Sequence, residues 1–315
     1  MTDGRAKGCC APRRNGASPA VPPLPAPGCS AQMRDHIEGL MIDLPGGRFL
    51  MGTDHPRYPE DQDSPARPVT VAPFRLARVA VTNRLFARFV AETGYRTTAE
   101  REGWSFVFHA FLPDGGAGLR GPVQAPWWRQ VHGACWSAPL GPGSGVTDRM
   151  DHPVTHVSHD DARAFCAHTG TRLPDEAEWE LAARGGLAGA RFPWGDEMTP
   201  EGRHRANTFQ GAFPGHDSGE DGHVGTAPVD AYDPNGLGLS NMTGNVWEWV
   251  ADSAGPLPGS DGARDDRLRV TRGGSYLCHA SYCERYFVHS RTFNTPDSST
   301  GHTGFRIAAA RQAGG

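Results

Sequence analysis

Residues 171–187 read TRLPDEAEWELAARGGL, and this stretch contains both ends of one helix. We predict that the helix begins after Pro174 and stops at Gly185, because proline is tolerated at a helix start and glycine readily ends one. Trp179 lies at helical spacing from the apolar residues around Leu173, which favours packing in a core. The stretch therefore predicts a short helix with a buried face.

Two further helices precede this stretch, and each is bounded by a capping side chain and a glycine. Thr82 or Asn83 is expected to cap a helix over NRLFARFVAET that stops at Gly94, with its apolar residues on one stripe. Another helix is expected after Ser158, in SHDDARAFCAHTG, with acids in its first turn and Gly170 at its end.

The rest of the chain favours short strands and long loops. Residues 41–52, MIDLPGGRFLMG, place a Gly-Gly turn between two apolar segments, which predicts a hairpin. The stretch 191–310 is rich in loops, with short strands expected at 268–272 and 304–309. Since no repeat and no second linker is visible, we predict a single α+β domain over residues 37–311, low in regular secondary structure.

Residues 1–36 differ from the rest because they are rich in proline, alanine and glycine and poor in large apolar groups. They can bury too little apolar surface to offset the entropy of ordering, so we expect a disordered tail. The 315-residue chain is long enough for a sizeable core, and its 41 glycines and 27 prolines favour a globular protein with many ordered loops.

Charge and hydropathy exclude several classes of protein. A formal net charge of -4 gives no field that would attract nucleic acid or an anionic membrane. No apolar run approaches the roughly 18 residues that span a bilayer, and the N-terminus lacks an apolar segment of signal-peptide type. We therefore expect a soluble, cytoplasmic protein. Its seven cysteines, an odd number, then favour buried, reactive or metal-binding thiols over disulfides.

Two of the cysteines, Cys278 and Cys283, lie in the segment RGGSYLCHASYCERY at residues 272–286. Four residues separate them, whereas zinc sites and redox pairs favour two, so neither is the natural interpretation. Two thiolates with few other ligands suit a soft ion such as Cu(I), and an open site of this kind leaves room for a third sulfur. The spacing alone equally allows buried thiols or an adventitious disulfide.

The same segment, followed by NTPDSS (294–299) and GFRIAAAR (304–311), resembles the C-terminal signature of the formylglycine-generating enzyme family, in its bacterial cytoplasmic form. Blocks such as LPDEAEWE are shared by the wider superfamily and imply the fold, which is related to the C-type-lectin-like folds. The paired cysteines with SFVF, APWW and NTPDSS are the specific part. Other blocks occur in the family's order: PGGRFLMG, VTNRLFARFV, DHPVTHVSHDDARAFC, TRLPDEAEWELAARGGL, FPWGDE, NTFQGAFP and TGNVWEW.

The resemblance implies an O2-dependent oxidoreductase that converts the cysteine of a Cys-X-Pro-X-Arg motif in a sulfatase-type protein to formylglycine. Cys278 and Cys283 would bind Cu(I), and the target cysteine would join them as a third thiolate before O2 oxidises its Cβ. Ser275 and Tyr282 would line the pocket, and Trp247 would form an aromatic wall. From the residues alone, a turn hydroxyl at Ser275 and a packed ring at Tyr282 are equally open.

The resemblance also implies two structural calcium ions, held by side-chain and carbonyl oxygens of the kind that hard cations prefer. The residues alone equally allow polar turns without a metal. The first set is Asn207, Thr208, Asp221 and His223, and the second is Asn241, Gly244, Val246 and Glu248.

A peptide substrate needs a groove. We expect Trp127 and Trp128, in APWW, to line it, with core packing as the open alternative. The proline of the target motif needs an apolar slot and its arginine an acid, which Glu100 or Glu102 would supply.

Two alternatives to this function differ from it in class. An iron-dependent sulfoxide synthase shares the superfamily fold, but it brings a further helical domain, and no iron triad is apparent here. A non-catalytic lectin-like module would have no reason to carry the cysteine pair. By the resemblance, Cys166 finds Ile307 where secreted members have its disulfide partner, so Cys166 should be a buried thiol. This supports the cytoplasmic location, and we expect a monomer.

The segment Cys10–Arg14, CAPRR, itself fits the Cys-X-Pro-X-Arg pattern. Short motifs often match by chance. A tethered segment nevertheless reaches a local concentration on the order of millimolar, so a weak ligand can compete. The hypothesis is that CAPRR occupies the peptide groove in cis or in trans, as a self-substrate or a mild inhibitor, with Cys10 offered to copper.

Overall fold

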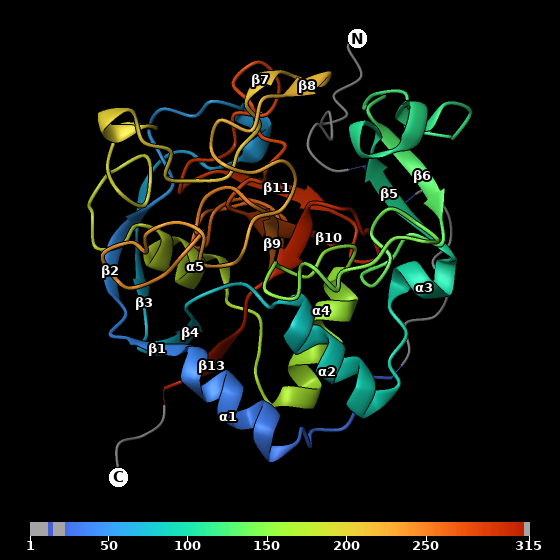
Figure 1. Ribbon diagram of the computed structural model, residues 1–315. Coiled ribbons are helices and arrows are strands. Elements are labelled where there is room, and N and C mark those ends of the chain that lie inside the picture. Colours follow the sequence, from blue (N-terminus) through green and yellow to red (C-terminus); the bar gives the residue numbers. More distant parts are fainter. Residues whose placement is uncertain (1–11, 15–22, 312–315) are drawn as a thin grey trace.

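The computed structural model describes residues 12–14 and 23–311, and it forms one α+β domain with much of its length in loops, as predicted (Figure 1). The α-helices are α1 (Ala31–Leu40), α2 (Asn83–Thr93), α3 (Thr98–Glu102), α4 (His159–Thr169) and α5 (Glu176–Ala183). The strands are β1 (Met41–Leu44), β2 (Gly47–Met51), β3 (Arg67–Val71), β4 (Phe74–Ala77), β5 (Trp104–Phe108), β6 (Trp128–His132), β7 (Gly211–Ala212), β8 (His216–Asp217), β9 (Trp247–Ala254), β10 (Asp265–Arg272), β11 (Arg291–Asn294), β12 (Thr303–Phe305) and β13 (Ala308–Ala310). Short 3-10 helices lie in the loops, namely η1 (Pro59–Asp61), η2 (His109–Phe111), η3 (Pro113–Gly116) and η4 (Pro200–Gly202).

The strands form several small sheets rather than one large layer. In the sheet at the centre of Figure 1, β10 lies between β11 and β9, and β12 pairs parallel to β9. A second sheet places β4 between β1 and β13, and the remaining strands pair two by two, β2 with β3, β5 with β6 and β7 with β8. Because β10 ends at Arg272, the central sheet delivers the chain directly to the segment that carries the cysteine pair.

The three helices predicted from the sequence are confirmed. Helix α2 begins at a Thr82 cap and ends at Gly94, and α4 begins at a Ser158 cap and ends at Gly170. Helix α5 ends at Ala183, shortly before the glycine predicted to stop it. Within the described ranges, no helix combines the length and the apolar character needed to cross a bilayer.

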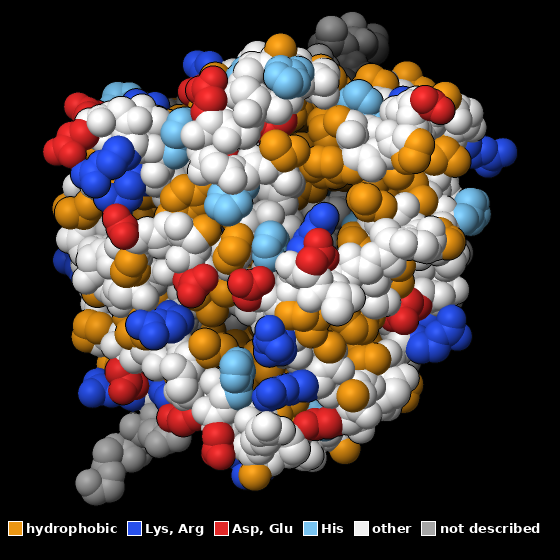
Figure 2. All heavy atoms as spheres, in the orientation of Figure 1, with side chains coloured by type: hydrophobic (Ala, Val, Ile, Leu, Met, Phe, Trp, Pro, Cys, Tyr) orange, Lys and Arg blue, Asp and Glu red, His pale blue; other side chains and the backbone are white. Residues whose placement is uncertain are grey.

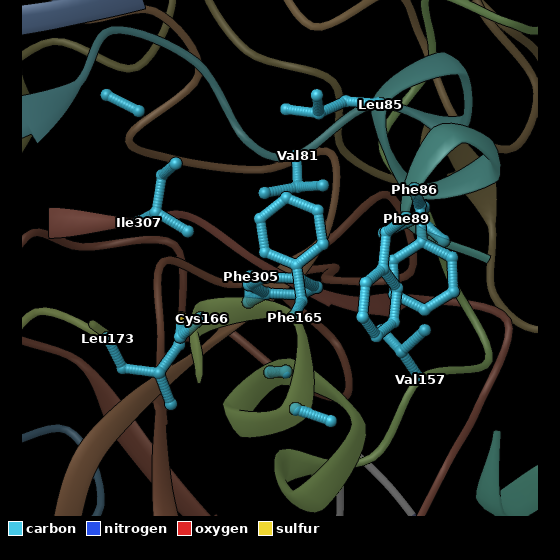
Figure 3. Packing of buried hydrophobic residues seen from close by; sticks show 14 of the residues in the cluster. Val81, Leu85, Phe86, Phe89, Val157, Phe165, Cys166, Leu173, Phe305 and Ile307 are labelled. Atoms are coloured by element: carbon cyan, nitrogen blue, oxygen red, sulfur yellow. The ribbon is translucent and has the colours of Figure 1, made fainter. Parts of the chain in front are cut away.

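Helices α2 and α4 pack together through aromatic side chains (Figure 3). Phe86 and Phe165 are stacked with their ring centroids 6.1 Å apart, and Phe305 of β12 meets both edge-on. Cys166 is a free thiol in the same buried cluster as Ile307, and burial raises its pKa to about 12. The predicted buried thiol on a helix is therefore confirmed.

Two predictions about strands are wrong. Residues 41–52 do not form a hairpin, because β1 pairs with β4 whereas β2 pairs with β3. The turn between β1 and β2 packs closely against the end of β3, since a Cβ on Gly46 would lie 2.3 Å from the Val71 carbonyl oxygen. The segment 304–309 is not one strand either, because β12 and β13 belong to different sheets.

The domain begins earlier than the sequence suggests. Helix α1 starts at Ala31, where the Ser30 hydroxyl accepts the Met33 N–H, and it buries Met33 and Ile37. The boundary expected at residue 37 therefore falls inside a helix, because two apolar residues one turn apart suffice to dock it. Residues 1–11 and 15–22 of the expected tail lie outside the described residues.

Helix α5 anchors the end of β10 through buried ion pairs. Glu176 Oε1 lies 3.0 Å from Arg272 Nη1, and Glu180 Oε2 accepts a hydrogen bond from Arg272 Nη2, with all three side chains fully buried. Arg272 also donates to the carbonyls of Val288 and His289, which lie beyond the cysteine pair. The helix encoded by residues 171–187 thereby holds both sides of the cysteine segment.

Candidate metal and substrate site

The sulfur atoms of Cys278 and Cys283 meet on one tight turn. The Cys278 N–H donates to the Ser275 carbonyl and the Cys283 N–H to the His279 carbonyl, which curls the chain. The two Sγ atoms are 3.5 Å apart, and both side chains are buried. Since a disulfide bond measures about 2.05 Å, the two cysteines are not bonded to each other, and a disulfide between them is wrong as an interpretation.

The two sulfurs are in different states. Cys278 is a free thiol whose pKa burial raises to about 11, although the Ser275 N–H donates to its Sγ. Cys283 takes part in a disulfide, which the sequence did not predict. Because thiolates are the form that binds soft metals, metal binding here requires that Cys283 be reduced and that Cys278 release its proton.

Residues from a loop distant in the sequence hold the end of this turn that follows Cys283. Arg285 donates to Asp61 from Nε at 2.6 Å and from Nη2 at 2.8 Å, and its guanidinium lies 3.8 Å above the Tyr58 ring. Burial raises the pKa of Asp61 to about 6, and Arg285 opposes that rise. On the near side Gly274 has φ +75°, and a Cβ there would lie 2.7 Å from the Arg285 carbonyl oxygen, so the turn requires glycine.

Three aromatic rings, Trp127, Phe213 and Tyr282, form what we call the aromatic wall. Phe213 and Tyr282 are stacked with centroids 4.6 Å apart, and Trp127 meets Tyr282 edge-on at 4.4 Å. All three are only partly buried, and Tyr282 is the neighbour of Cys283. Figure 2 shows hydrophobic side chains gathered around a hollow towards the upper right of the view. The wall thus offers an apolar surface beside the cysteine pair.

Trp128 does not belong to this surface. It begins β6 and is wholly buried, 4.7 Å from the His302 ring and 6.2 Å from the Phe108 ring, measured between centroids. Its expected place in an exposed groove is therefore wrong. Neighbouring residues in extended chain point to opposite sides, so only one of the two tryptophans could face outwards.

The remaining predicted catalytic residues lie at the same place. Trp247 is packed in one buried cluster with both cysteines, and its Nε1 has no hydrogen-bond partner. The Ser275 hydroxyl accepts the Leu277 N–H, so it stabilises the turn while lying next to Cys278. An indole donor without a partner, at the cysteine pair, is available to a bound ligand.

The first expected calcium set is drawn together by Asp221. Its carboxylate accepts the Thr208 N–H at 2.9 Å and the His223 N–H at 3.0 Å, which brings the two predicted carbonyl ligands to one loop crossing. Asn207 is adjacent and donates to the Gly225 carbonyl. Oxygens of these types suit a hard cation, although the Thr208 carbonyl already accepts a hydrogen bond from Gln210 Nε2.

The second set fits in part. Asn241 Oδ1 is buried and accepts no hydrogen bond, so this oxygen could serve as a ligand of a cation. Both Glu248 oxygens, however, already accept hydrogen bonds from Arg306, at 2.6 and 2.7 Å. A carboxylate has about four lone-pair positions, so Glu248 can hold a cation only by sharing. Gly244 and Val246 lie between Asn241 and Glu248 in the sequence, and a Cβ on Gly244 would meet the Asn207 carbonyl oxygen.

Residues 29–311 match a family model described as the sulfatase-modifying factor enzyme 1-like domain. The chain belongs to this family. A formylglycine-generating enzyme of Thermomonospora curvata is 57% identical over 281 residues, which cover 85% of this chain and 93% of that one. An inactive C-alpha-formylglycine-generating enzyme 2 of Bos taurus is 46% identical over 277 residues, which cover 85% and 87%. The solved structure of PvdO from Pseudomonas aeruginosa is 26% identical, with a TM-score of 0.60 over 86% of this chain and 94% of that one.

The match to the sulfatase-modifying factor family confirms the family and the fold that the sequence predicted. Because a member named as inactive has similar identity, the family match alone does not decide activity, and the side chains at the site decide it. Among the described residues, no group of three or more His, Cys, Asp or Glu side chains is placed to hold a metal. The sequence did not predict Phe213, Tyr58 or Asp61, since no local pattern marks them.

Proposed function

We propose that this chain is a copper-dependent formylglycine-generating oxidase that acts on the cysteine of a Cys-X-Pro-X-Arg motif in a sulfatase-type protein and uses O2. The observation that carries the proposal is the meeting of the Cys278 and Cys283 sulfurs, 3.5 Å apart, beside the aromatic wall. The family relative from Thermomonospora curvata bears the name of this activity.

The residues of the turn fit Cu(I). Both candidate ligand atoms are soft sulfurs, and two of them leave a position open for a third. Bound copper would supply the centre at which the target thiolate and O2 react. The chain's own contribution is to hold Cys278 and Cys283 at one point, through the anchors at Arg272 and Arg285, and to keep the site buried. The unpartnered Trp247 Nε1 donor would orient the sulfur or oxygen that enters.

The direct test is the mass change of a synthetic Cys-X-Pro-X-Arg peptide incubated with the protein, copper and O2. Oxidation of a CH2SH group to an aldehyde releases two electrons and reduction of O2 to water takes four, so a thiol reductant is included. We expect the mass shift of CH2SH to CHO with copper and none without it. A sulfoxide synthase would add oxygen to a sulfur instead, and a lectin-like module would leave the peptide unchanged.

The aromatic wall is proposed to hold the peptide. We expect Trp127→Ala to raise KM for the peptide about tenfold, since a partly exposed ring contributes on the order of 1–2 kcal/mol to such a contact. The melting temperature should fall only a little, because Trp127 is partly buried and packs against Phe213 and Tyr282 rather than inside the core. Phe49→Ala, on β2, serves as the control. An unchanged KM would place the peptide elsewhere.

Calcium is proposed as a structural ion at the Asp221 set and, with Glu248 shared between the ion and Arg306, at the Asn241 set. Chelation with EGTA should then lower the melting temperature, since an ion present at about 100 times its Kd stabilises by roughly 2.7 kcal/mol. The chelator should have a smaller effect on Asp221→Asn than on the wild type. A wild-type melting temperature that is unchanged by EGTA would indicate that hydrogen bonds alone hold these loops.

We further propose a cytoplasmic monomer. The free, buried thiol of Cys166 beside Ile307 suits a reducing compartment, and the proposed copper site likewise needs Cys283 as a reduced thiol rather than in its disulfide.

A further inference from the structure

The described residues of the N-terminal segment are bound to the domain. Arg14 is 7% exposed, and its backbone N–H donates to Ser298 Oγ at 3.1 Å. Its Nη2 donates to the Trp104 carbonyl at 2.6 Å and to Ser299 Oγ at 3.0 Å, and its guanidinium lies 3.9 Å above the Trp104 ring. Stacking combined with hydrogen bonding is how proteins recognise an arginine side chain. We call Trp104, Ser298 and Ser299 the arginine subsite.

A second residue of the same segment is also held. Pro12 is buried, and its carbonyl accepts a hydrogen bond from Asn294 Nδ2 at 3.3 Å. Arg13, between them, is only partly buried. The proline and arginine positions of CAPRR therefore both contact the domain, while Cys10 lies outside the described residues. Asn294, Ser298 and Ser299 all belong to NTPDSS, one of the segments that the sequence marks as specific to the family.

The arginine subsite is connected to the cysteine turn. Tyr276, two residues before Cys278, donates from its hydroxyl to the Gly301 carbonyl at 3.0 Å. The Gly301 N–H in turn donates to the Phe106 carbonyl of β5, the strand that begins with Trp104. The hydrogen bonds through Gly301 therefore join β5, which begins at the arginine subsite, to the cysteine turn.

Acidic side chains near Arg14 favour its positive charge, but not all of its hydrogen-bond donors have a partner. Burial lowers the pKa of Arg14, and the nearby charges of Glu102 and Asp297 oppose this. Glu102 Oε1 is buried and accepts no hydrogen bond, whereas Glu100 is engaged in the α3 capping box. Arg14 Nε and Nη1 likewise have no hydrogen-bond partner. A guanidinium with unsatisfied donors is bound weakly enough to be exchanged.

We propose that residues 12–14 are an intramolecular ligand of the substrate groove, which must leave the arginine subsite before the arginine of a protein substrate can bind. The proposal rests on the proposed function for the identity of that substrate. Attachment to the same chain gives the segment a local concentration on the order of millimolar, so even a weak contact competes.

Competition is measured with a labelled peptide in which serine replaces the motif cysteine, so that binding is read without turnover. We expect the Kd of this Ser-X-Pro-X-Arg peptide to fall roughly tenfold in Arg14→Ala, because its subsite is then empty. Arg13→Ala, the neighbouring arginine, is the matched control and should bind like the wild type. If the peptide binds Arg14→Ala and the wild type with equal Kd values, the intramolecular ligand is ruled out while the proposed function stands.

Trypsin provides an independent readout, since it cleaves after exposed arginines. The bond after Arg14 should be cut slowly in the wild type, and faster when Ser299→Ala loosens the subsite or when the peptide is added in excess. Cleavage after Arg14 that is fast in the wild type would contradict the contact itself. If the peptide binds no variant at all, the substrate class in the proposed function is wrong, and residues 12–14 then have no substrate with which to compete.

Discussion

Cys283→Ser is expected to abolish conversion of a Cys-X-Pro-X-Arg peptide while leaving the protein folded. A hydroxyl is a hard, poor ligand for Cu(I), so the turn would retain a single soft ligand at Cys278. Even contacts outside the ligand shell of a metal are worth 10–100-fold, so the loss of a ligand should exceed about 100-fold. Cys278→Ser should have the same effect, because the two sulfurs are 3.5 Å apart and hold one ion together.

Cys135→Ser is the matched control, since it removes a buried thiol that lies outside this turn. Peptide conversion and Cu(I) affinity are measured together with the melting temperature for each variant. Normal copper affinity and normal conversion in Cys283→Ser would contradict the two-thiolate site.

Glu176→Gln is expected to cause the largest loss of stability. Its carboxylate lies 3.0 Å from Arg272 Nη1 and accepts a hydrogen bond from Arg291 Nη2 at 2.7 Å, and all three side chains are fully buried. Removing one partner of a buried ion pair leaves an uncompensated charge and costs about 3–5 kcal/mol. The midpoint of urea unfolding should fall with the slope unchanged.

Glu201→Gln provides the comparison, because its ion pair with Arg203 is exposed and should contribute less than about 1 kcal/mol. A loss below about 1 kcal/mol in Glu176→Gln would mean that the α5 network is not what holds the end of β10.

Features encoded by neighbouring residues were predictable. The ends of α4 follow from Ser158 and Gly170, whose effects reach no further than one turn of helix. The cysteine pair was visible because its two members lie on a single turn, so they are close in the sequence as well as in space. Family blocks then supplied the fold, since they recur in a fixed order along the chain.

Features that join distant segments were not predictable. The partner of β2 is β3 rather than β1, and nothing within residues 41–52 distinguishes these pairings. Arg285 is held by Asp61, and Tyr282 by Phe213, through contacts that only the folded chain creates. Trp127 and Trp128 are identical by type, yet one faces the site and the other the core, because β6 begins between them.

X-ray absorption at the copper edge of the reduced protein loaded with Cu(I) measures directly which atoms hold the ion. We expect Cys278 and Cys283 to provide two sulfur ligands in the resting protein, and a Cys-X-Pro-X-Arg peptide to add a third under anaerobic conditions. The serine version of the peptide should leave the sulfur count unchanged. A spectrum dominated by nitrogen or oxygen ligands, or an unchanged number of sulfur ligands when the cysteine peptide is added, would rule out the two-thiolate copper site.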